Sequence, residues 1–300
     1  MLYRNKAILL ILLGVIWGSG YSIARYCVTH GVPSLGYSFW QSLGPAIVLC
    51  SLALATASSC DRAASHRIQL KTHRGPTLRY FFLCGLIGIA IPNTTMYFGA
   101  AHLPSSLLTI LVNTAPLFIY PMALLSRQER FRPLRFVVLA LGIAGMLLMI
   151  LQHNVLPTFY SIPWTLLVLL TPICFAFCDL LVNPLKPEGL PPLTAAAGML
   201  LASSLILLPF LLSLHAFYAL HLNFLSSLIV LEILLSSIGY ILFFKLIYLA
   251  GPVYYSLVGG VVALTGIFWG LIIFNETWTR GDTLGTFLIV GAIIALSKFK

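Results

Sequence analysis

The chain has 300 residues, of which 60% are hydrophobic and 8% are charged, and its mean hydropathy is +1.00. Soluble globular domains carry about 25% charged residues, so this composition excludes a soluble protein and indicates one that crosses a membrane several times. The net charge of +10 comes from basic residues that cluster on one predicted side of the membrane, which indicates topology rather than a nucleic-acid partner.

The sequence predicts ten apolar spans of about 17–25 residues, long enough as helices to cross a hydrocarbon core about 30 Å thick. In chain order, the expected spans are 6–26, 34–57, 78–98, 105–125, 135–152, 163–183, 192–213, 224–249, 252–274 and 283–298. The loops between them are too short to hold a soluble domain. Arg4 and Lys6 precede the apolar run of the first span as in a signal peptide, but no clear cleavage site follows, so we expect an uncleaved helix.

The basic residues outside the spans lie mostly on one side. If the N-terminus is inside, the outer loops hold only Arg25 and Arg280 of the 17 basic residues, and Lys245 falls within the eighth span. By the positive-inside rule, both termini are then cytoplasmic. We therefore expect an integral protein of a bacterial inner membrane, with anionic lipid headgroups as its neighbours.

The chain contains an internal repeat. Residues 78–151 and 224–296 each contain two spans, a short polar segment and a third span, with Glu129 and Glu276 at matching places. Two further spans precede each copy. A unit with an odd number of spans must lie upside down relative to its twin in the membrane, and inverted repeats are typical of secondary transporters.

We therefore predict an all-α membrane protein of ten transmembrane helices, arranged as two inverted five-helix repeats. The first repeat is expected over 1–152 and the second over 153–300. Pairs of small residues such as Gly14 and Gly18 have the spacing that lets membrane helices approach closely.

Several spans contain helix-breaking residues. Pro92-Asn93 interrupts the third span at the place that matches Gly239-Tyr240 in the eighth, and Pro116 and Pro121 are expected to bend the fourth. Paired interruptions in matching spans of a transporter point to its substrate site. The alternative is a simple kink whose freed carbonyl groups bond to neighbouring helices.

Aromatic and amide side chains inside the spans are the candidate substrate ligands. Buried amides need hydrogen-bond partners, which a polar cavity supplies, and aromatic rings bind cationic or aromatic solutes. Helix packing is the alternative for any one of them alone. The predicted set is Trp17, Tyr21, Trp40, Gln41, Asn93, Tyr97, Asn113, Tyr240 and Trp269.

Three charged residues inside the spans are candidate gating or coupling groups, because a charge in a bilayer is costly. Asp179 and Lys245 fall near the inner ends of their spans and could pair; a structural ion pair or snorkelling of Lys245 is the alternative. Glu232 could carry a coupling proton or reach the outer headgroups. We interpret Arg25 as snorkelling and Glu276 as a structural carboxylate near a helix start.

Together these features resemble the EamA-type transporters of the drug/metabolite transporter superfamily, over nearly the whole chain. The matching segments are Trp17-Gly18-Ser19-Gly20, Ala101 to Ser105 with Pro116 and Glu129, Tyr248 to Pro252 with Leu264, Asn275-Glu276, and the glycines Gly142 and Gly291. The resemblance implies two inverted five-helix repeats, a central cavity, and movement of amino acids or other small metabolites. One departure is Gln41, where the family often has an arginine.

We expect a secondary transporter of small organic solutes that works by alternating access between the two repeats and is driven by a proton or solute gradient. The resemblance favours export of amino acids or related metabolites. Uptake or exchange of a metabolite, for example S-adenosylmethionine or a nucleotide-like solute, is the alternative, and a non-transport membrane scaffold or receptor is the second alternative. We expect no enzyme, cofactor or metal site, because the zincin, nucleophile-elbow, Walker and Rossmann motifs are missing.

Overall fold

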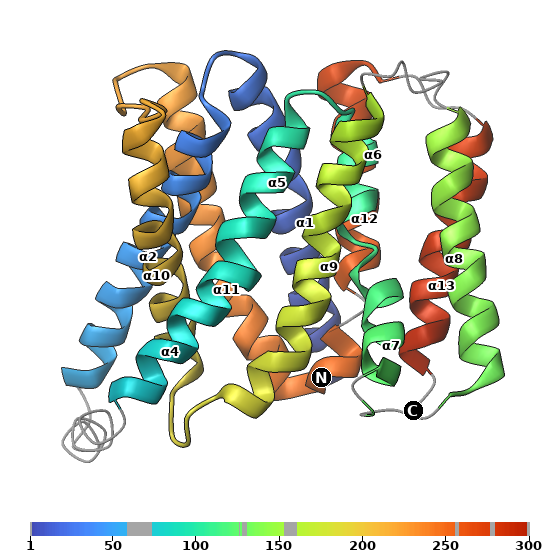
Figure 1. Ribbon diagram of the computed structural model, residues 1–300, viewed down its shortest axis with the longest axis horizontal. Helices are drawn as coiled ribbons and strands as arrows, with labels where there is room; N and C mark the ends of the chain where they lie inside the picture. The colour runs from blue at the N-terminus through green and yellow to red at the C-terminus, as the bar shows by residue number, and fades with distance from the viewer. Residues whose placement is uncertain are drawn as a thin grey trace.

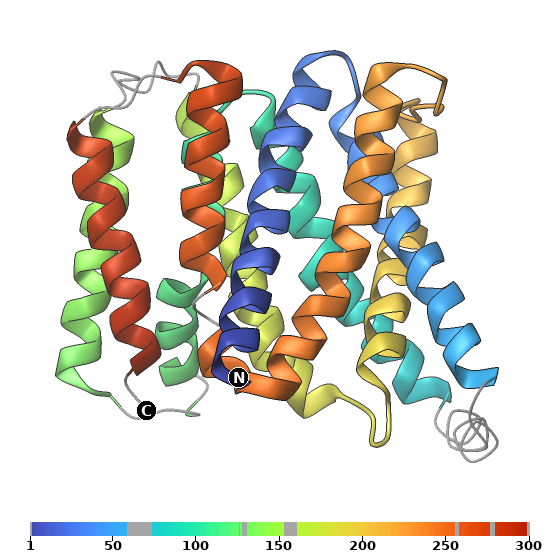
Figure 2. The ribbon, with the colours of Figure 1, turned by 180° about the vertical axis from the view of Figure 1, so that it is seen from behind.

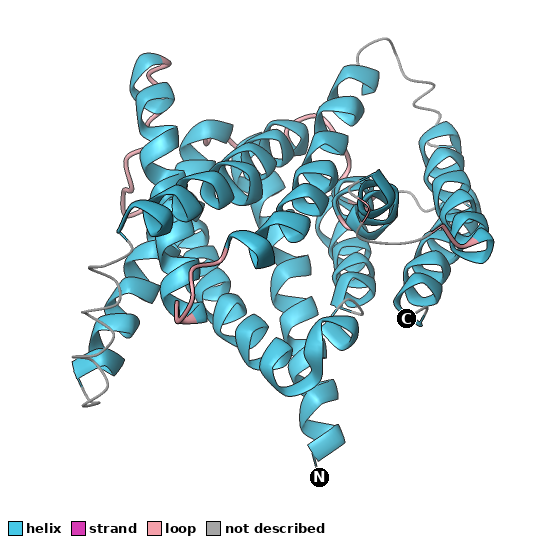
Figure 3. Cartoon of the chain, turned by 60° about the horizontal axis from the view of Figure 1, so that its bottom comes forward, coloured by secondary structure: helices cyan, strands magenta, loops and turns pink. Residues whose placement is uncertain are grey.

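The computed structural model of this chain describes residues 2–58, 74–125, 127, 131–152, 161–255, 258–276 and 280–298 (Figures 1 and 2). All regular elements in these residues are helices, and Figure 3 shows no strand among them. The helices are α1 (Leu2–Thr29), α2 (Ser34–Ser58), α4 (Arg74–Gly85), the π-helix η1 (Leu86–Ala90), α5 (Ile91–Ala100), α6 (Ser105–Val112), α7 (Ala115–Leu125), α8 (Pro133–Gln152), α9 (Ser161–Leu185), α10 (Pro192–Ser213), α11 (Phe224–Tyr255), α12 (Val258–Phe274) and α13 (Arg280–Lys298).

These helices form the ten expected spans, with α4, η1 and α5 making the third and α6 and α7 the fourth. Of the described stretches, five are long and apolar enough by themselves to cross a membrane: Lys6–Thr29, Ser34–Ala55, Gly75–Ala100, Pro192–Ser213 and Phe224–Phe243. Shorter apolar helices make up the remainder. The predicted all-α membrane fold is confirmed.

Both chain ends lie at the same end of the bundle, which we call the terminal side; the opposite end is the distal side (Figure 1). Helix α1 runs from the terminal to the distal side, whereas α9 begins on the distal side and runs back (Figure 1). The two five-helix halves are therefore inverted relative to each other. Equivalent helices pack in pairs at the two edges of the molecule, α2 against α10 and α8 against α13 (Figures 1 and 2).

The third span contains its expected irregularity as a π-helical segment rather than a break. Pro92 has no N–H to donate, and the five residues of η1 end just before it. The hydroxyls of Thr95 and Thr171 both donate to the Pro92 carbonyl oxygen, at 3.0 and 3.1 Å. Thr171 lies on α9, so this irregular backbone is held by a helix from the other half.

The matching place in the second half is not interrupted. Helix α11 continues through Gly239 and Tyr240 to Tyr255, because glycine keeps the N–H that a helix needs. The fourth span breaks at Asn113-Thr114, before Pro116, instead of bending at the prolines. Asn113 ends α6 by donating from its side-chain amide to the Thr109 carbonyl at 2.7 Å. Pro116 then lies in the first turn of α7, where a missing N–H costs least.

Helices α1 and α12 approach closely at the small residues expected to pack there. A Cβ atom added to Gly18 would lie 2.6 Å from Thr265 Cβ and 2.7 Å from the Val262 carbonyl oxygen. Gly14 meets Val261 in the same way, at 2.5 Å. No larger residue fits at either position without moving the two helices apart.

A carboxylate of the second half joins the two halves near the distal side, in what we call the Glu276 interlock (Glu276, Arg25, Ser105 and Ser106). Glu276 accepts hydrogen bonds from the backbone N–H of Ser105 at 2.6 Å, from that of Ser106 at 3.1 Å, and from the Ser106 hydroxyl at 2.5 Å. It also forms an ion pair with Arg25. The carboxylate therefore satisfies two of the free N–H groups at the start of α6 and neutralises an arginine of α1.

The interlock corrects our interpretation of Arg25 and agrees with that of Glu276 as a structural carboxylate near a helix start. Arg25 pairs with a carboxylate and stacks over Phe274, with its guanidinium carbon 4.3 Å from the ring centre, rather than snorkelling to headgroups. Glu276 caps a helix of the other half, not one beside it in the sequence. Its repeat counterpart, Glu129, lies outside the described residues.

We predict that Glu276→Ala lowers the free energy of unfolding by about 3 kcal/mol, because it leaves a largely buried arginine and the helix start without partners. SDS-induced unfolding of the purified protein measures this change. Glu188→Ala is the matched control, since Glu188 is exposed in the α9–α10 turn and should change stability little. Equal effects of the two variants would contradict the interlock.

We also predict that Gly18→Ala destabilises the protein by about 1–3 kcal/mol through overpacking between α1 and α12. Gly75→Ala is the control, because nothing lies within 4 Å of the position its Cβ would take. The same unfolding measurement compares the two variants. Equal stability of Gly18→Ala and Gly75→Ala would contradict the close contact between α1 and α12.

Candidate functional site

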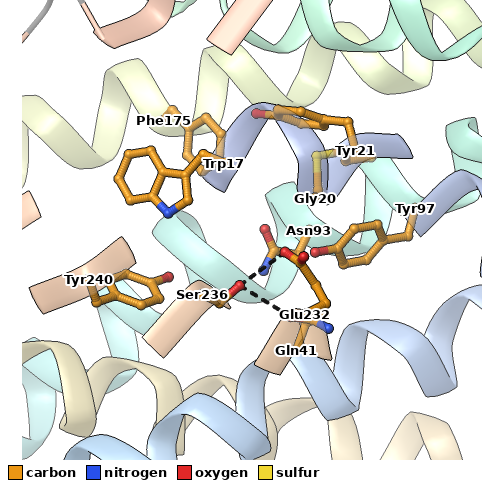
Figure 4. Close-up of a pocket in the computed structure, with 11 residues that line it drawn as sticks. Trp17, Gly20, Tyr21, Gln41, Asn93, Tyr97, Phe175, Glu232, Ser236 and Tyr240 are labelled. Atoms are coloured by element: carbon orange, nitrogen blue, oxygen red, sulfur yellow. Dashed lines mark hydrogen bonds between the residues drawn. The ribbon is translucent and has the colours of Figure 1, made fainter. Parts of the chain in front are cut away.

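A cavity of about 110 Å³ lies deep between the two halves, lined by helices α1, α2 and α5 of the first half and α9 and α11 of the second (Figure 4). Its lining residues are Trp17, Gly20, Tyr21, Gln41, Asn93, Met96, Tyr97, Phe175, Glu232, Ser236 and Tyr240. We call this cavity the central pocket.

The spacing of the lining residues explains how three helices supply most of the wall. Residues four apart share one helix face. This spacing brings Trp17 with Tyr21, and Asn93 with Tyr97, to the central pocket. On α11 it brings Glu232, Ser236 and Tyr240 there in succession, which makes the second half's share of the wall mainly one stripe of a single helix.

Buried side chains pack against the central pocket on its distal side. Four fully buried residues lie about one turn further in that direction on the helices that line it, and belong to one hydrophobic cluster: Ala24, Tyr37, Ala100 and Ile229. The ring of Tyr37 stands edge-on to that of Tyr97, with ring centres 4.8 Å apart. The distal wall of the central pocket is therefore densely packed at these four residues.

The polar groups of the central pocket are incompletely paired. The Ser236 hydroxyl lies 3.2 Å from Glu232 Oε1 and 3.4 Å from Gln41 Oε1, and it can donate to one of them at a time (Figure 4). Glu232 Oε2 and Gln41 Nε2 are buried and have no hydrogen-bond partner. Buried polar atoms are rarely left this way, so these two mark a place where a ligand could bind.

Two glycines let the polar and aromatic groups come close. A Cβ on Gly20 would lie 2.5 Å from Glu232 Oε1, and a Cβ on Gly239 would lie 2.5 Å from Trp17 Nε1. The indole of Trp17 also stands edge-on to Tyr240, with ring centres 6.3 Å apart. Gly239 therefore serves the pocket by giving room to Trp17, although it does not interrupt its helix.

The structure brings seven of the residues singled out in the sequence to this one cavity: Trp17, Tyr21, Gln41, Asn93, Tyr97, Tyr240 and Glu232. Glu232 is only 5% exposed, so it does not reach outer headgroups as one of our two interpretations had it.

Three predicted substrate ligands lie elsewhere. Trp40 donates from its indole N–H to the Tyr218 carbonyl at 2.8 Å, and Trp269 donates to the Ser19 hydroxyl at 2.8 Å. Asn113 stands at the break between α6 and α7, where its side chain is within hydrogen-bonding reach of the pocket residue Tyr21.

The gating pair stays a prediction. Lys245 is exposed on α11, and Asp179 belongs to α9 with a side chain outside the described part of the structure. Gly20, Met96, Phe175 and Ser236 were missed by sequence reasoning. Ser236 could have been found, since it lies midway between Glu232 and Tyr240 on the same helix face. Among the described residues, no three His, Cys, Asp or Glu side chains come together as metal ligands.

Comparison with known proteins agrees with this architecture. The sequence profile of the EamA-like transporter family matches residues 5–151 and again residues 162–298. No curated protein sequence matches the chain. A solved structure described only as "Crystal structure of protein" is 13% identical, with a TM-score of 0.63 over 98% of this chain and 97% of that one, which is a similarity of fold.

The double profile match covers nearly the whole chain, and the helices form the two-repeat architecture that such a match requires. The chain belongs to the EamA-like transporter family of the drug/metabolite transporter superfamily, and it is a membrane transporter of small solutes.

Proposed function

We propose that the protein is a secondary active transporter that binds its solute in the central pocket and works by alternating access between its two halves, 1–152 and 153–300. The observation that carries this proposal is the position of the pocket. It lies at the contact between inverted repeats, and both repeats contribute to its wall. Transporters built from inverted repeats bind solute at such a contact and rock around it.

The packing around the pocket fits a conformation of the alternating-access cycle in which the distal side is closed. Closed packing on the distal side, formed by the cluster around Tyr37, would hold the solute until the halves move. The π-helical segment at Pro92 adds a deformable element beside the pocket residue Asn93, and such segments are frequent at functional sites. No nucleotide-binding motif accompanies the ten helices, so a proton or solute gradient is the proposed source of energy.

The volume of the cavity favours a small solute. Pockets for drug-sized ligands measure about 300–1,000 Å³, whereas the central pocket holds about 110 Å³. Amino acids or related metabolites fit this limit better, and export is proposed from the resemblance noted in the sequence. We place the protein in a bacterial inner membrane with its terminal side in the cytoplasm. Helix α4, which carries Arg79, and helix α8, which follows Arg132, begin on that side, and α9, which precedes Lys186, ends there (Figure 1). The positive-inside rule favours this orientation.

A binding screen tests the proposal. We expect at least one solute in a library of amino acids, amines, nucleosides and S-adenosyl compounds to stabilise the detergent-purified protein against heat. A ligand of the native state at 100 times its Kd adds about 2.7 kcal/mol of stability. Trp17→Ala and Asn93→Ala should remove this gain.

The control is Trp40→Phe, which changes an aromatic residue outside the central pocket and should keep the stabilisation. Uptake into proteoliposomes loaded with the same solute then separates a transporter from a passive receptor. Stabilisation that survives both pocket variants, or a bound solute that never crosses the membrane, would overturn the proposed function.

A further inference from the structure

We propose that the solute is an organic cation, whose amine or ammonium group sits against the free carboxylate oxygen of Glu232. This inference rests on the proposed function, since it names the class of solute for the same pocket. The inference is drawn from the charge and the hydrogen bonding of Glu232. The proposed transport site was drawn from the size and position of the cavity, which are independent of that charge.

Glu232 is a buried carboxyl group with half of its hydrogen-bonding capacity unused. Its side chain points into the central pocket (Figure 4), its Oε1 accepts from Ser236, and its Oε2 has no partner. A carboxylate removed from water without a partner is costly, and more so within a bilayer. A cation placed at Oε2 would offset that cost directly.

The protein itself supplies no such cation in the part of the chain that the structure describes. The ion pair formed there joins Arg25 to Glu276, so that arginine is already neutralised. Lys245 is on the same helix as Glu232 but 13 residues further along, which corresponds to about 20 Å. Glu232 therefore faces the pocket with only neutral groups around it, and the counter-charge is left to the solute.

The rest of the wall suits a cation and not an anion. Five aromatic residues line the same cavity as the carboxylate: Trp17, Tyr21, Tyr97, Phe175 and Tyr240. The faces of such rings attract ammonium groups, and the attraction is strongest when water is excluded. A purely anionic solute would meet the Glu232 carboxylate with no basic side chain among the lining residues to balance it.

Pairs of probes with the same shape and different charge test the proposal. The probes are choline with 3,3-dimethylbutan-1-ol, and n-butylamine with 1-butanol, applied to the full-length protein in detergent while its thermal midpoint is followed. We expect each cation to stabilise at concentrations at least tenfold below those of its neutral counterpart.

Glu232→Gln should abolish this preference, because it keeps the shape of the side chain and removes its charge. Glu188→Gln removes the same charge from an exposed turn and should leave the preference unchanged. Glu232→Asp retains the charge and should retain a preference for cations even if its affinity falls. A monodisperse gel-filtration profile shows that each variant is folded.

The proposal is overturned if cation and neutral counterpart bind equally, if neither cation stabilises the protein, or if Glu232→Gln keeps the preference. Failure here is distinguishable from failure of the proposed function. A neutral or anionic solute whose stabilisation is lost in Trp17→Ala would keep the central pocket as the transport site and remove only its selection for cations. No binding by a solute of any charge would count against both.

Discussion

Hydrocarbon offers no hydrogen bonds, so every polar group between the helices must find its partner inside the protein. Two carboxylates of the second half, the part-buried Glu276 and the buried Glu232, meet this constraint in opposite ways. Glu276 is saturated by two backbone N–H groups, a hydroxyl and an arginine. Glu232 accepts a hydrogen bond from a single hydroxyl, and its other carboxylate oxygen has no partner. We infer that Glu276 holds the two halves together and that the free oxygen of Glu232 binds the solute.

The same constraint applies where the described spans are irregular, at η1 beside Pro92 and at the break between α6 and α7. The carbonyl of Pro92 is satisfied by threonine hydroxyls, one of them from the other half. The break at Asn113 is closed by its own side chain. Glycines at helix contacts then set the distance between helices, closely at Gly18 and with room for an indole at Gly239. Hydrogen bonds to these carbonyl groups and close helix packing at the glycines together position the walls of the central pocket.

Much of this arrangement could be predicted from the sequence. Apolar length and an odd-numbered repeat are one-dimensional signals, so they predicted ten spans and their inversion. The partner of a side chain is a three-dimensional property, and there the sequence was a weaker guide. Trp40 and Trp269 lie within apolar spans just as Trp17 does, so the sequence does not distinguish them. Their indole N–H groups donate to the Tyr218 carbonyl and the Ser19 hydroxyl, outside the pocket. The pairing of Arg25 with Glu276 joins residues at opposite ends of the chain, which no spacing rule could indicate.

The central claim is that the cavity between the halves holds the transported solute, and protection of a single cysteine tests it most directly. With the six native cysteines replaced, Ser236→Cys places a thiol in the pocket wall, and Ser227→Cys places one on an exposed turn of the same helix. We expect a stabilising solute to slow alkylation at Ser236→Cys and to leave that at Ser227→Cys unchanged. Equal alkylation with and without solute at the pocket position would contradict it.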